Sequence, residues 1–521
     1  MPTHPAITSA RLIVGMEIHV ELATRTKMFT RVASPASAEL AHADAPPPNT
    51  LIDPVVLGLP GALPVLNRAA IDMSIQVGLS LGCQIAPFTK WDRKSYFYPD
   101  LPKNYQISQY DLPLCFDGAI DIPDPSDPAG VATHRIGIIR AHLEEDAGKL
   151  LHDWPGGGAI DFSIADYNRA GTPLLEIVTA PDFTTADQAV VFAQMLRNTC
   201  RFLGVTEGIM QKGHMRFEPN INMILSLEDG HEVRTPIVEV KNLNSFKSLR
   251  GAIEYEAREQ PARWQADGRV MGKGAKSTRG WDDDRQCTFL QREKEDAHDY
   301  RYFPDPDLLP VTVGADWVER LRATLPEPPH AREKRYIAEY ALKPKEARAL
   351  VEERDVCLLY ESVIDAAVAA SSNRITSADA GRLAANIVLQ NCQKRANERA
   401  VLVSDLGARP IQLGAIIALR EAGEISAAGL DELVGACCDD PAADPRALAQ
   451  SRNLLLVRDT GALESWCDAV LADPALAKAV ADVKSGKDAA VGRLVGEVMK
   501  RSGGKADAAS ARAMLLAKAR D

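Results

Sequence analysis

The stretch Met16-Glu17-Ile18-His19-Val20-Glu21-Leu22 alternates aliphatic and polar residues without a break. A period of two is typical of a β-strand with one buried face, because successive side chains of a strand point to opposite sides. The aliphatic residues supply the buried face, so Glu17, His19 and Glu21 share the other face. Three potential metal ligands then converge on one spot. An ordinary solvated strand face is the alternative, and it would be preferred if the pattern stood alone.

The pattern recurs in three later stretches of the chain. Their polar side chains at steps of two are Arg140, His142 and Glu144, then Arg216, Glu218, Asn220 and Asn222, and finally Glu239 and Lys241. Four strands that place carboxylates beside Arg, His or Lys predict one sheet with a charged polar face. Clustered carboxylates repel one another and raise each other's pKa values, so a cation bound between them is the simplest stabiliser.

The donor types narrow the choice of cation. Oxygen-rich sites suit Mg²⁺, which is usually held by a few carboxylates together with substrate phosphates. Histidine would also suit manganese or zinc, so composition leaves the metal open, and we expect magnesium with a nucleotide. Residues 272–277 lack the glycine spacing of a Walker A loop, so the nucleotide is expected to lie across the sheet.

Length and composition indicate a multidomain globular protein. A chain of 521 residues with 46% hydrophobic and 25% charged residues predicts roughly three domains. The formal charge of −11 argues against nonspecific nucleic-acid binding over the whole surface. Residues 484–521 nevertheless carry nine Lys or Arg against four acids, which suits either phosphate contacts or a solvated helical face.

Cysteine usage and hydropathy indicate a cellular compartment. The nine cysteines include no CxxC pair and are expected to be reduced, mostly buried thiols. No apolar run approaches the ~20 residues that span a bilayer. We therefore expect a cytoplasmic protein, or one in an organelle matrix after import, without a membrane partner.

The patterning changes along the chain and predicts an α+β fold. Residues 1–310 are rich in strand-like alternation and Gly/Pro turns, which predicts a mixed or antiparallel sheet domain that acts as a catalytic cradle. Ala, Leu, Glu and Arg at helical spacing then predict a helical domain over 311–409. A composition break near residues 407–410 separates it from a small helical tail, residues 410–521.

Long motifs in this chain resemble the B subunit of the tRNA-dependent amidotransferase, the GatB family. They are VGMEIHVEL (14–22), WDRKSYFYPDLPK (91–103), HLEEDAGK (142–149), DYNRAGTPLLE (166–176), VKNLNSF (240–246) and DYRYFP (299–304). The C-terminal end resembles the family's YqeY-like tail in GEIS (423–426) and GKDAAVGRLVGEVMK (486–500). Together the matches cover nearly the whole chain and are weakest between about 310 and 410.

The resemblance implies a ligase that forms a C–N bond in two steps. ATP phosphorylates the side-chain carboxylate of Glu on tRNA(Gln) or of Asp on tRNA(Asn), and ammonia then displaces the phosphate to give the amide. Cys83 lacks a catalytic context and is expected to be a structural thiol, so ammonia must come from another protein. The resemblance implies a GatA-like amidase subunit and a small GatC-like subunit in a heterotrimer, with mischarged tRNA and not DNA as substrate.

By the same resemblance, residues of the charged face receive roles. Those implied as cation ligands are Glu17, His19, Glu144, Glu145, Glu218 and Glu239. Glu17, His19, Glu144 and Glu145 are also expected to act in catalysis with Arg216 and Lys241. Lys149, Arg140 and Arg169 are expected to bind the ATP phosphates or the substrate carboxylate.

Two departures from the family pattern bear on these roles. Many members carry Asp where this chain has Glu218, followed by Pro219, which predicts a longer reach to the metal and an edge position or bulge. Some relatives carry a four-cysteine zinc knuckle, and the matching positions here are Thr30, Val32, Asp53 and Val56. None of these offers a thiolate, so no structural zinc is expected.

Alternative functions remain open at this stage. The charged sheet alone would suit a stand-alone metal-dependent carboxylate-amine ligase, and the tail alone would suit a noncatalytic tRNA-binding scaffold. The aromatic loop from Trp91 to Asp111 is expected either to line the substrate entrance or to pack against the A subunit. The sequence does not distinguish the Gln pathway from the Asn pathway.

Overall fold

The computed structural model describes residues 4–43, 45–127, 132–154, 156–293, 300–372, 374–456, 460–485, 488–504 and 506–520. The chain forms two compact units, Met1–Pro329 and His330–Asp521. The first unit contains the strands and the second is helical, so the predicted α+β class is confirmed. The boundaries near residues 310 and 409 stay predictions. Of the family motifs, Asp299, Gly486 and Lys487 lie outside the described residues.

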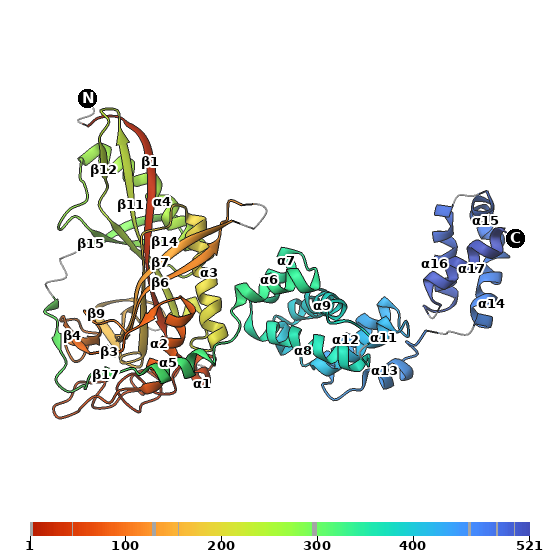
Figure 1. Cartoon of the computed structure of the whole chain (residues 1–521), viewed down its shortest axis with the longest axis horizontal. Helices are drawn as coiled ribbons and strands as arrows, with labels where there is room; N and C mark the ends of the chain where they lie inside the picture. Colours follow the sequence, from red (N-terminus) through yellow and green to blue (C-terminus); the bar gives the residue numbers. More distant parts are fainter. Residues whose placement is uncertain are drawn as a thin grey trace. The chain divides into compact units, whose positions relative to one another are not determined.

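A large mixed sheet organises the first unit (Figure 1). Its strands are β1 (Ile7–Glu21), β2 (Gln84–Ile85), β6 (Cys115–Pro123), β7 (Thr133–Glu145), β10 (Pro173–Thr179), β11 (Met215–Leu227), β12 (Glu232–Arg234), β13 (Val238–Lys241), β14 (Ser277–Asp282) and β15 (Cys287–Glu293). The strand order is β15-β14-β13-β11-β1-β10-β7-β6-β2, with β12 paired to β11. Neighbours are antiparallel except for the parallel pair β13 and β14.

Smaller sheets surround the large one. They comprise β16 (Phe303–Pro304), β4 (Asp92–Ser95) and β5 (Tyr105–Ser108), then β17 (Val311–Thr312) with β3 (Phe88–Thr89), and β8 (Lys149–Asp153) with β9 (Ala159–Asp166). The segment that was expected to be a loop from Trp91 to Asp111 therefore contains two antiparallel strands, β4 and β5. The distant segment 303–304 joins them as a third strand.

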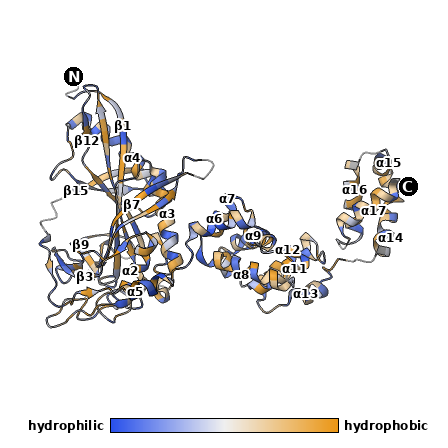
Figure 2. Ribbon diagram, viewed as in Figure 1, coloured by the Kyte–Doolittle hydropathy of each residue, from blue (hydrophilic) through white to orange (hydrophobic). Residues whose placement is uncertain are grey.

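Helices cover the apolar face of the large sheet. The helices of this unit are α1 (Ala38–Ala41), α2 (Arg68–Ser80), α3 (Ala186–Leu203), η1 (Met210–Lys212), α4 (Phe246–Asp267) and α5 (Ala315–Arg322). Ile18 of β1 lies in one core with Ile75 of α2, Phe192 of α3 and Ile253 of α4. Figure 2 shows the hydrophobic residues along these strands and helices. Alternation along β1 thus places Glu17 and His19 on the face opposite the helices.

Local signals explain where the two long helices begin and end. The side chains of Thr185 and Ser245 accept hydrogen bonds from backbone N–H groups of the first turns of α3 and α4. Such N-caps satisfy donors that the helix leaves unpaired. Gly204 and Gly268 end these helices in the left-handed region, with φ of 71° and 67°, where glycine is favoured.

Pro219 does not mark an edge or a bulge, so that expectation is wrong. Strand β11 lies between β1 and β13 inside the sheet. Its register with β1 runs without a shift from Met215 to Ser226, with Pro219 opposite Met16. The ladder to β13 pairs Asn220 and Ile221, so Pro219 lies just beyond the end of that ladder. A missing N–H is tolerated where a ladder ends.

The second unit is helical throughout its described residues. Its elements are α6 (Pro329–Tyr340), α7 (Pro344–Leu350), α8 (Arg354–Ala370), α9 (Ser377–Asn386), η3 (Ile387–Cys392), α10 (Gln393–Arg399), η4 (Val403–Leu406), α11 (Pro410–Glu421), α12 (Ala427–Asp439), α13 (Pro445–Ser451), α14 (Thr460–Leu471), η5 (Pro474–Leu476), α15 (Ala477–Lys484), η6 (Asp488–Ala490), α16 (Val491–Arg501) and α17 (Ala508–Arg520). Helix α11 packs closely on α8, because a Cβ at Gly414 would lie 2.6 Å from the Cβ of Ala366. The elements from α14 to α17 share a separate apolar core around Val470, Leu494 and Leu515.

Cysteine state and hydropathy agree with the sequence. All nine cysteines are free thiols, and all but Cys287 are buried. Burial raises the pKa of the Cys83 thiol to about 12, which fits a structural residue and not a nucleophile. Among the described residues, no helix is long and apolar enough to cross a membrane.

Candidate active site

The strand register aligns the polar residues of four strands in one row. Arg216 of β11 lies opposite His19 of β1, His19 lies opposite Glu176 of β10, and Glu176 lies opposite His142 of β7. A second row places Glu218 opposite Glu17. Directly opposed residues on one face have Cβ atoms ~5 Å apart, so these side chains meet. Alternation fixes the face of each residue, and the register fixes its neighbours.

Two groups of potential cation ligands result, and His19 belongs to both. Glu17, His19 and Glu218 form one group, and His19, Glu144 and Glu176 form the other, each with ligand atoms within 4.8 Å of one another. His19 Nε2 lies 3.5 Å from Glu176 Oε2 and 3.8 Å from Glu17 Oε1. The sheet therefore brings together Glu17, His19, Glu144 and Glu218 as the sequence predicted.

The small sheet of β4 and β5 holds Glu144 from the side. Ser108 Oγ donates to Glu144 Oε1 at 2.6 Å, and Gln106 Nε2 donates to Glu144 Oε2 at 2.8 Å. Lys94 Nζ lies 3.7 Å from Glu144 Oε1 and 5.4 Å from the ring centre of Tyr300. Glu144 is thus fixed by two hydrogen bonds and a cation, and these donors come from residues outside the large sheet.

Lys241 connects the acidic groups at the β13 side. Its Nζ donates to Glu218 Oε2 at 2.6 Å and lies 3.5 Å from Glu239 Oε1. Thr278 Oγ1 also donates to Glu239, at 3.1 Å from Oε2. Glu239 is therefore close to the cluster but outside both ligand groups among the described residues.

A second charged group lies beside the first and includes Arg216 and Arg169. Arg216 bonds to the carboxylate of Asp146 and lies 4.0 Å from Glu21 Oε1. Arg169 lies 3.5 Å from Asp146 Oδ2 and donates to the carbonyl oxygens of Ala147 and Gly148 at 3.0 and 2.8 Å. Arg169 therefore fixes the turn that follows β7.

The carboxyl groups of the face differ in their pKa values. Burial raises the pKa of Glu17, and the charge of Glu176 adds to this effect. Burial lowers the pKa of His19, but its bond to Glu176 and the charge of Glu218 outweigh burial and raise that pKa to about 9. Burial would raise the pKa of Glu144, but Lys94 outweighs it and holds the pKa at about 2. Permanently ionised carboxylates therefore lie beside groups that retain protons at neutral pH.

Unpartnered polar atoms indicate that a ligand fits this face. Within the described part of the chain, His19 Nδ1, His142 Nδ1, Arg216 Nε and Asn220 Oδ1 are buried without a hydrogen-bond partner. Buried polar atoms are nearly always bonded, so orphaned atoms gathered at one place call for an explanation. Carboxylate oxygens with imidazole nitrogens suit Mg²⁺ or Mn²⁺, and either ligand group described above would hold such an ion.

Three predicted residues lie elsewhere or take different contacts. Glu145 is on the opposite side of β7 from Glu144, where it pairs with Lys103 and accepts a hydrogen bond from the Ile107 N–H at 3.0 Å. Lys149 is exposed at the start of β8, outside the large sheet. Arg140 is half exposed, with Nη2 3.9 Å from Glu176 Oε1. The alternation of β7 already separates Glu145 from Glu144.

Sequence reasoning missed two members of the site. Glu176 belongs to both an ion pair with His19 and a ligand group, yet it is the only acid in the apolar stretch Pro173–Thr179. A lone acid in an otherwise apolar strand was the signal that could have identified it. Lys94 was recognised as part of an aromatic loop, and its reach to Glu144 depends on pairing between β4 and β5.

The positions that match the zinc knuckle of some relatives are joined by direct hydrogen bonds. Thr30 Oγ1 donates to Asp53, and the N–H of Val56 donates to Asp53 Oδ1 at 2.9 Å. Val32 accepts a backbone hydrogen bond from Lys27 at 2.9 Å. The Asp53 carboxylate thus links two positions that thiolates occupy in those relatives.

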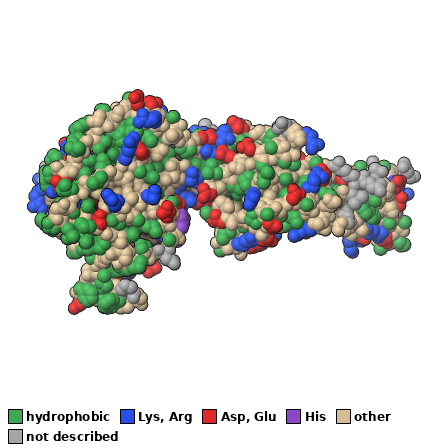
Figure 3. All heavy atoms as spheres, turned by 90° about the horizontal axis from the view of Figure 1, so that it is seen from below, with side chains coloured by type: hydrophobic (Ala, Val, Ile, Leu, Met, Phe, Trp, Pro, Cys, Tyr) green, Lys and Arg blue, Asp and Glu red, His purple; other side chains and the backbone are tan. Residues whose placement is uncertain are grey.

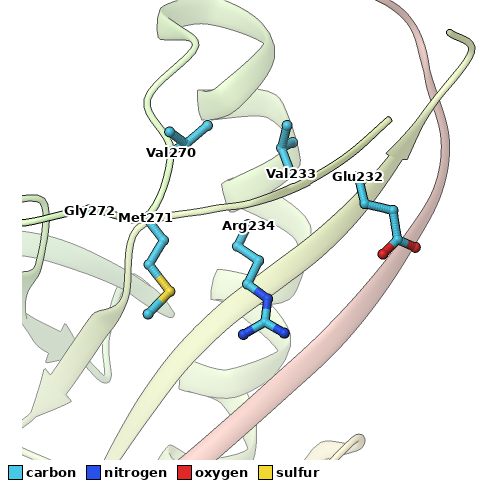
Figure 4. A pocket seen from close by; sticks show the side chains of 6 residues that line it. All are labelled: Glu232, Val233, Arg234, Val270, Met271 and Gly272. Carbon is cyan, nitrogen blue, oxygen red and sulfur yellow. The ribbon is translucent and has the colours of Figure 1, made fainter. Parts of the chain in front are cut away.

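A surface hollow lies apart from the predicted site residues (Figure 4). It is formed by Glu232, Val233 and Arg234 of β12 and by residues 270–272 of the loop after α4. Its side chains comprise one acid, one base and three apolar groups, and Figure 4 shows Glu232 apart from Arg234. This composition offers no ligand set comparable to the acidic face.

An acidic, ligand-seeking sheet face flanked by buried Lys and Arg is typical of enzymes that bring anionic substrates together, as in phosphoryl transfer. Comparison with known proteins specifies the class. The model of the GatB/GatE catalytic domain matches residues 12–319, and the model of the GatB domain matches residues 371–518. The chain belongs to the GatB/GatE family, and the resemblance drawn from its motifs is confirmed.

Curated relatives match along nearly the whole chain. The B subunit of aspartyl/glutamyl-tRNA(Asn/Gln) amidotransferase from Thermomicrobium roseum is 42% identical over 503 residues, which cover 96% of this chain and 97% of that protein. The protein of the same name from Thermosynechococcus vestitus is 40% identical over 520 residues, which cover 99% of this chain and 98% of that protein. That from Rhodopirellula baltica is 41% identical over 495 residues, with 94% and 93% covered.

Proposed function

We propose that this chain is the component of a tRNA-dependent amidotransferase that activates the side-chain carboxylate of a mischarged aminoacyl-tRNA. ATP phosphorylates the carboxylate of Glu on tRNA(Gln) or of Asp on tRNA(Asn), and ammonia then displaces the phosphate to give the amide. The observation that carries the proposal is the convergence of Glu17, His19, Glu144, Glu176 and Glu218 on one sheet face, in a chain whose relatives bear this enzyme's name.

The basic side chains of the face meet the main physical demand of this reaction, which is to bring two anions together. Lys241 and Lys94 remain charged, because neighbouring carboxylates raise their pKa values despite the opposing effect of burial. Arg216 is held by Asp146 with its Nε unpaired, so one donor remains for a phosphate or a carboxylate. Bound Mg²⁺ would add charge neutralisation and polarise phosphate oxygens.

The proposed roles follow these positions. Glu17, His19, Glu144, Glu176 and Glu218 hold cations, with Glu239 orienting Lys241 at their edge. Lys241, Arg216 and Arg140 orient the phosphates and the substrate carboxylate. Glu145 and Lys149 have weaker support, because their contacts lie outside the acidic face.

Exposed apolar groups support partner proteins for this chain. Figure 3 shows hydrophobic side chains spread over the surface of the first unit. Leu63, Val65 and Leu309 are exposed to 61%, 72% and 85%, respectively. Exposed apolar surface of this kind is typical of protein interfaces. We propose an amidase-like A subunit that supplies ammonia and a small C subunit, with the basic C-terminal helices contacting tRNA.

The test is ATP-dependent amide formation by the full chain with its amidase partner, measured on Glu-tRNA(Gln) and Asp-tRNA(Asn). The proposal expects amide only when ATP, tRNA and glutamine are all present. ATP turnover without tRNA would favour the stand-alone carboxylate-amine ligase. Unchanged amide formation by Glu17→Gln would favour the noncatalytic scaffold, because that variant removes a carboxylate from the ligand cluster.

A further inference from the structure

Lys27 is a fully buried lysine that lies outside the acidic face. Its relative exposure is 0%. Lysine is almost never fully buried unless its ammonium is paired. Here the Nζ donates to the carbonyl oxygens of Leu51 at 2.6 Å, Ala170 at 2.7 Å and Tyr167 at 3.4 Å. An ammonium has three N–H donors, so three carbonyls use its whole donor capacity.

These carbonyls come from two segments that are far apart in the sequence. One is the loop that contains Leu51, and the other is the turn 167–171 before β10. Asn168 joins the same two segments, because its Oδ1 accepts from the N–H groups of Thr50 and Leu51, each at 2.8 Å. Its Nδ2 donates to Pro47 O at 2.8 Å. Lys27 and Asn168 therefore form a latch between the loop 47–51 and the turn 167–171.

The turn that the latch holds carries Arg169 into the candidate active site. Arg169 Nε lies between Ala147 O and Asp146 Oδ2, at 3.0 and 3.5 Å, and Asp146 in turn binds Arg216. The backbone reinforces this connection, because Gly171 N donates to Asp146 O at 2.9 Å. The path from Lys27 to Arg216 thus consists of contiguous polar contacts through the turn, Arg169 and Asp146.

We propose that Lys27 is a positioning residue, which orders the turn 167–171 so that Arg169 and Asp146 present Arg216 to the substrate anions. This inference rests on the proposed function for its effect on catalysis, whereas the ordering of the turn does not. Lys27 touches no ligand-cluster residue, so it acts through Arg169. A lysine that only fills core volume would stabilise the fold without being coupled to Arg169.

The activity test is a double-mutant cycle in the full chain with its partner proteins. The variants are Lys27→Met, Arg169→Gln and the double variant, assayed for kcat and KM of amide formation. We expect Lys27→Met to lower kcat at least tenfold with little change in KM for glutamine. The double variant should lose no more than the larger single loss, within about threefold. Losses that multiply would mean that the residues act independently and would overturn the proposal.

A readout without activity separates this inference from the proposed function. Amide hydrogen exchange of residues 166–172 should accelerate at least tenfold in Lys27→Met. The matched control is Lys212→Met, since Lys212 Nζ also donates to a backbone carbonyl, that of Ala41 at 2.5 Å, far from Arg169 in sequence. Unchanged exchange in Lys27→Met, or equal acceleration in the control, would overturn the proposal even if the wild type forms amide.

Loss of folding in Lys27→Met would not leave the proposal untested. Asn168→Ala opens the same latch from the other segment without removing a buried charge, and it enters the same cycle with Arg169→Gln. We expect faster exchange of residues 166–172 and non-additive kcat losses for this variant as well. Additive losses or native exchange would contradict the latch.

Discussion

The polar face of the sheet and the surface of the helical unit treat charge in opposite ways. On the sheet, Glu144, Glu176 and Glu239 are buried with their partners. In the helical unit, pairs such as Arg382–Asp379 and Arg399–Asp439 lie exposed, and the core around Val470 and Leu494 is apolar. Burying charge costs several kcal/mol per ion unless partners offset it, whereas exposed pairs contribute little. Buried, incompletely bonded charge therefore identifies a functional surface, and exposed charge does not.

The largest expected effect tests this contrast with matched acids. Glu144→Gln should lower amide formation on the order of 1000-fold, about 4 kcal/mol, because the site loses a fixed negative charge that organises cations. Glutamine hydrolysis by the partner should persist. The measurement is single-turnover amide formation on mischarged tRNA.

Glu497→Gln is the control for that experiment. Glu497 is an acid of α16 that pairs with Arg501 at the surface. We expect wild-type turnover for this variant. Equal losses in Glu497→Gln and Glu144→Gln would break the comparison between the two regions.

Acid should destabilise the first unit through a buried histidine. Burial and the charge of Lys212 lower the pKa of His214 to about 4 from 6.5. Since the unfolded chain binds this proton more tightly, His214 contributes no penalty above pH 6.5 and destabilises the fold as the pH falls to 4. At about 1.4 kcal/mol per pKa unit the loss reaches about 3 kcal/mol.

Urea unfolding of the first unit between pH 7 and pH 4 measures this loss. His214→Gln should flatten that part of the pH profile, because it removes the titrating group. An identical pH dependence in the wild type and the variant would assign the acid sensitivity to other groups.

The sequence predicted the charged face because alternation depends only on the local period of a strand. Glu17, His19, Glu144 and Glu218 were identified from this period, and the structure brings them together. Register depends on pairing between strands far apart in the chain, which is why Glu176 was missed. It is the member that links His19 to His142.

Local runs of charge misled the prediction where the strand ended. Glu145 follows Glu144 directly and therefore faces Lys103 on the other side of β7. Lys149 lies past a turn, where alternation no longer applies, and it is exposed. The helical unit was easier to predict, because α8 buries Ile364 and Ala367 at the spacing that the sequence shows.

Removing the basic end should have a moderate and selective effect. Truncation after Leu456 removes the elements α14 to α17, which share their own apolar core. We expect tRNA affinity to fall about tenfold at low salt, because several phosphate contacts are lost. Filter binding at two salt concentrations measures the change, and unfolding of the first unit should stay the same. Unchanged affinity would make the basic end a solvated surface only.

The smallest expected effect concerns an exposed ion pair of the helical unit. Arg446 donates to Glu424 at 2.7 Å with most of its side chain in solvent. Arg446→Ala should change the free energy of unfolding by less than about 0.5 kcal/mol, because solvent screens such pairs. Denaturant unfolding measures it. A loss above about 2 kcal/mol would show that surface charge in this unit is structural after all.

Cation binding by the acidic face is the claim on which the account depends most. Manganese binding to the full chain, followed by electron paramagnetic resonance, tests it without any substrate or partner. We predict that the wild type and Glu497→Gln bind Mn²⁺ alike, and that Glu176→Gln weakens binding at least about tenfold. Equal Mn²⁺ affinity in Glu176→Gln and the wild type would contradict the account.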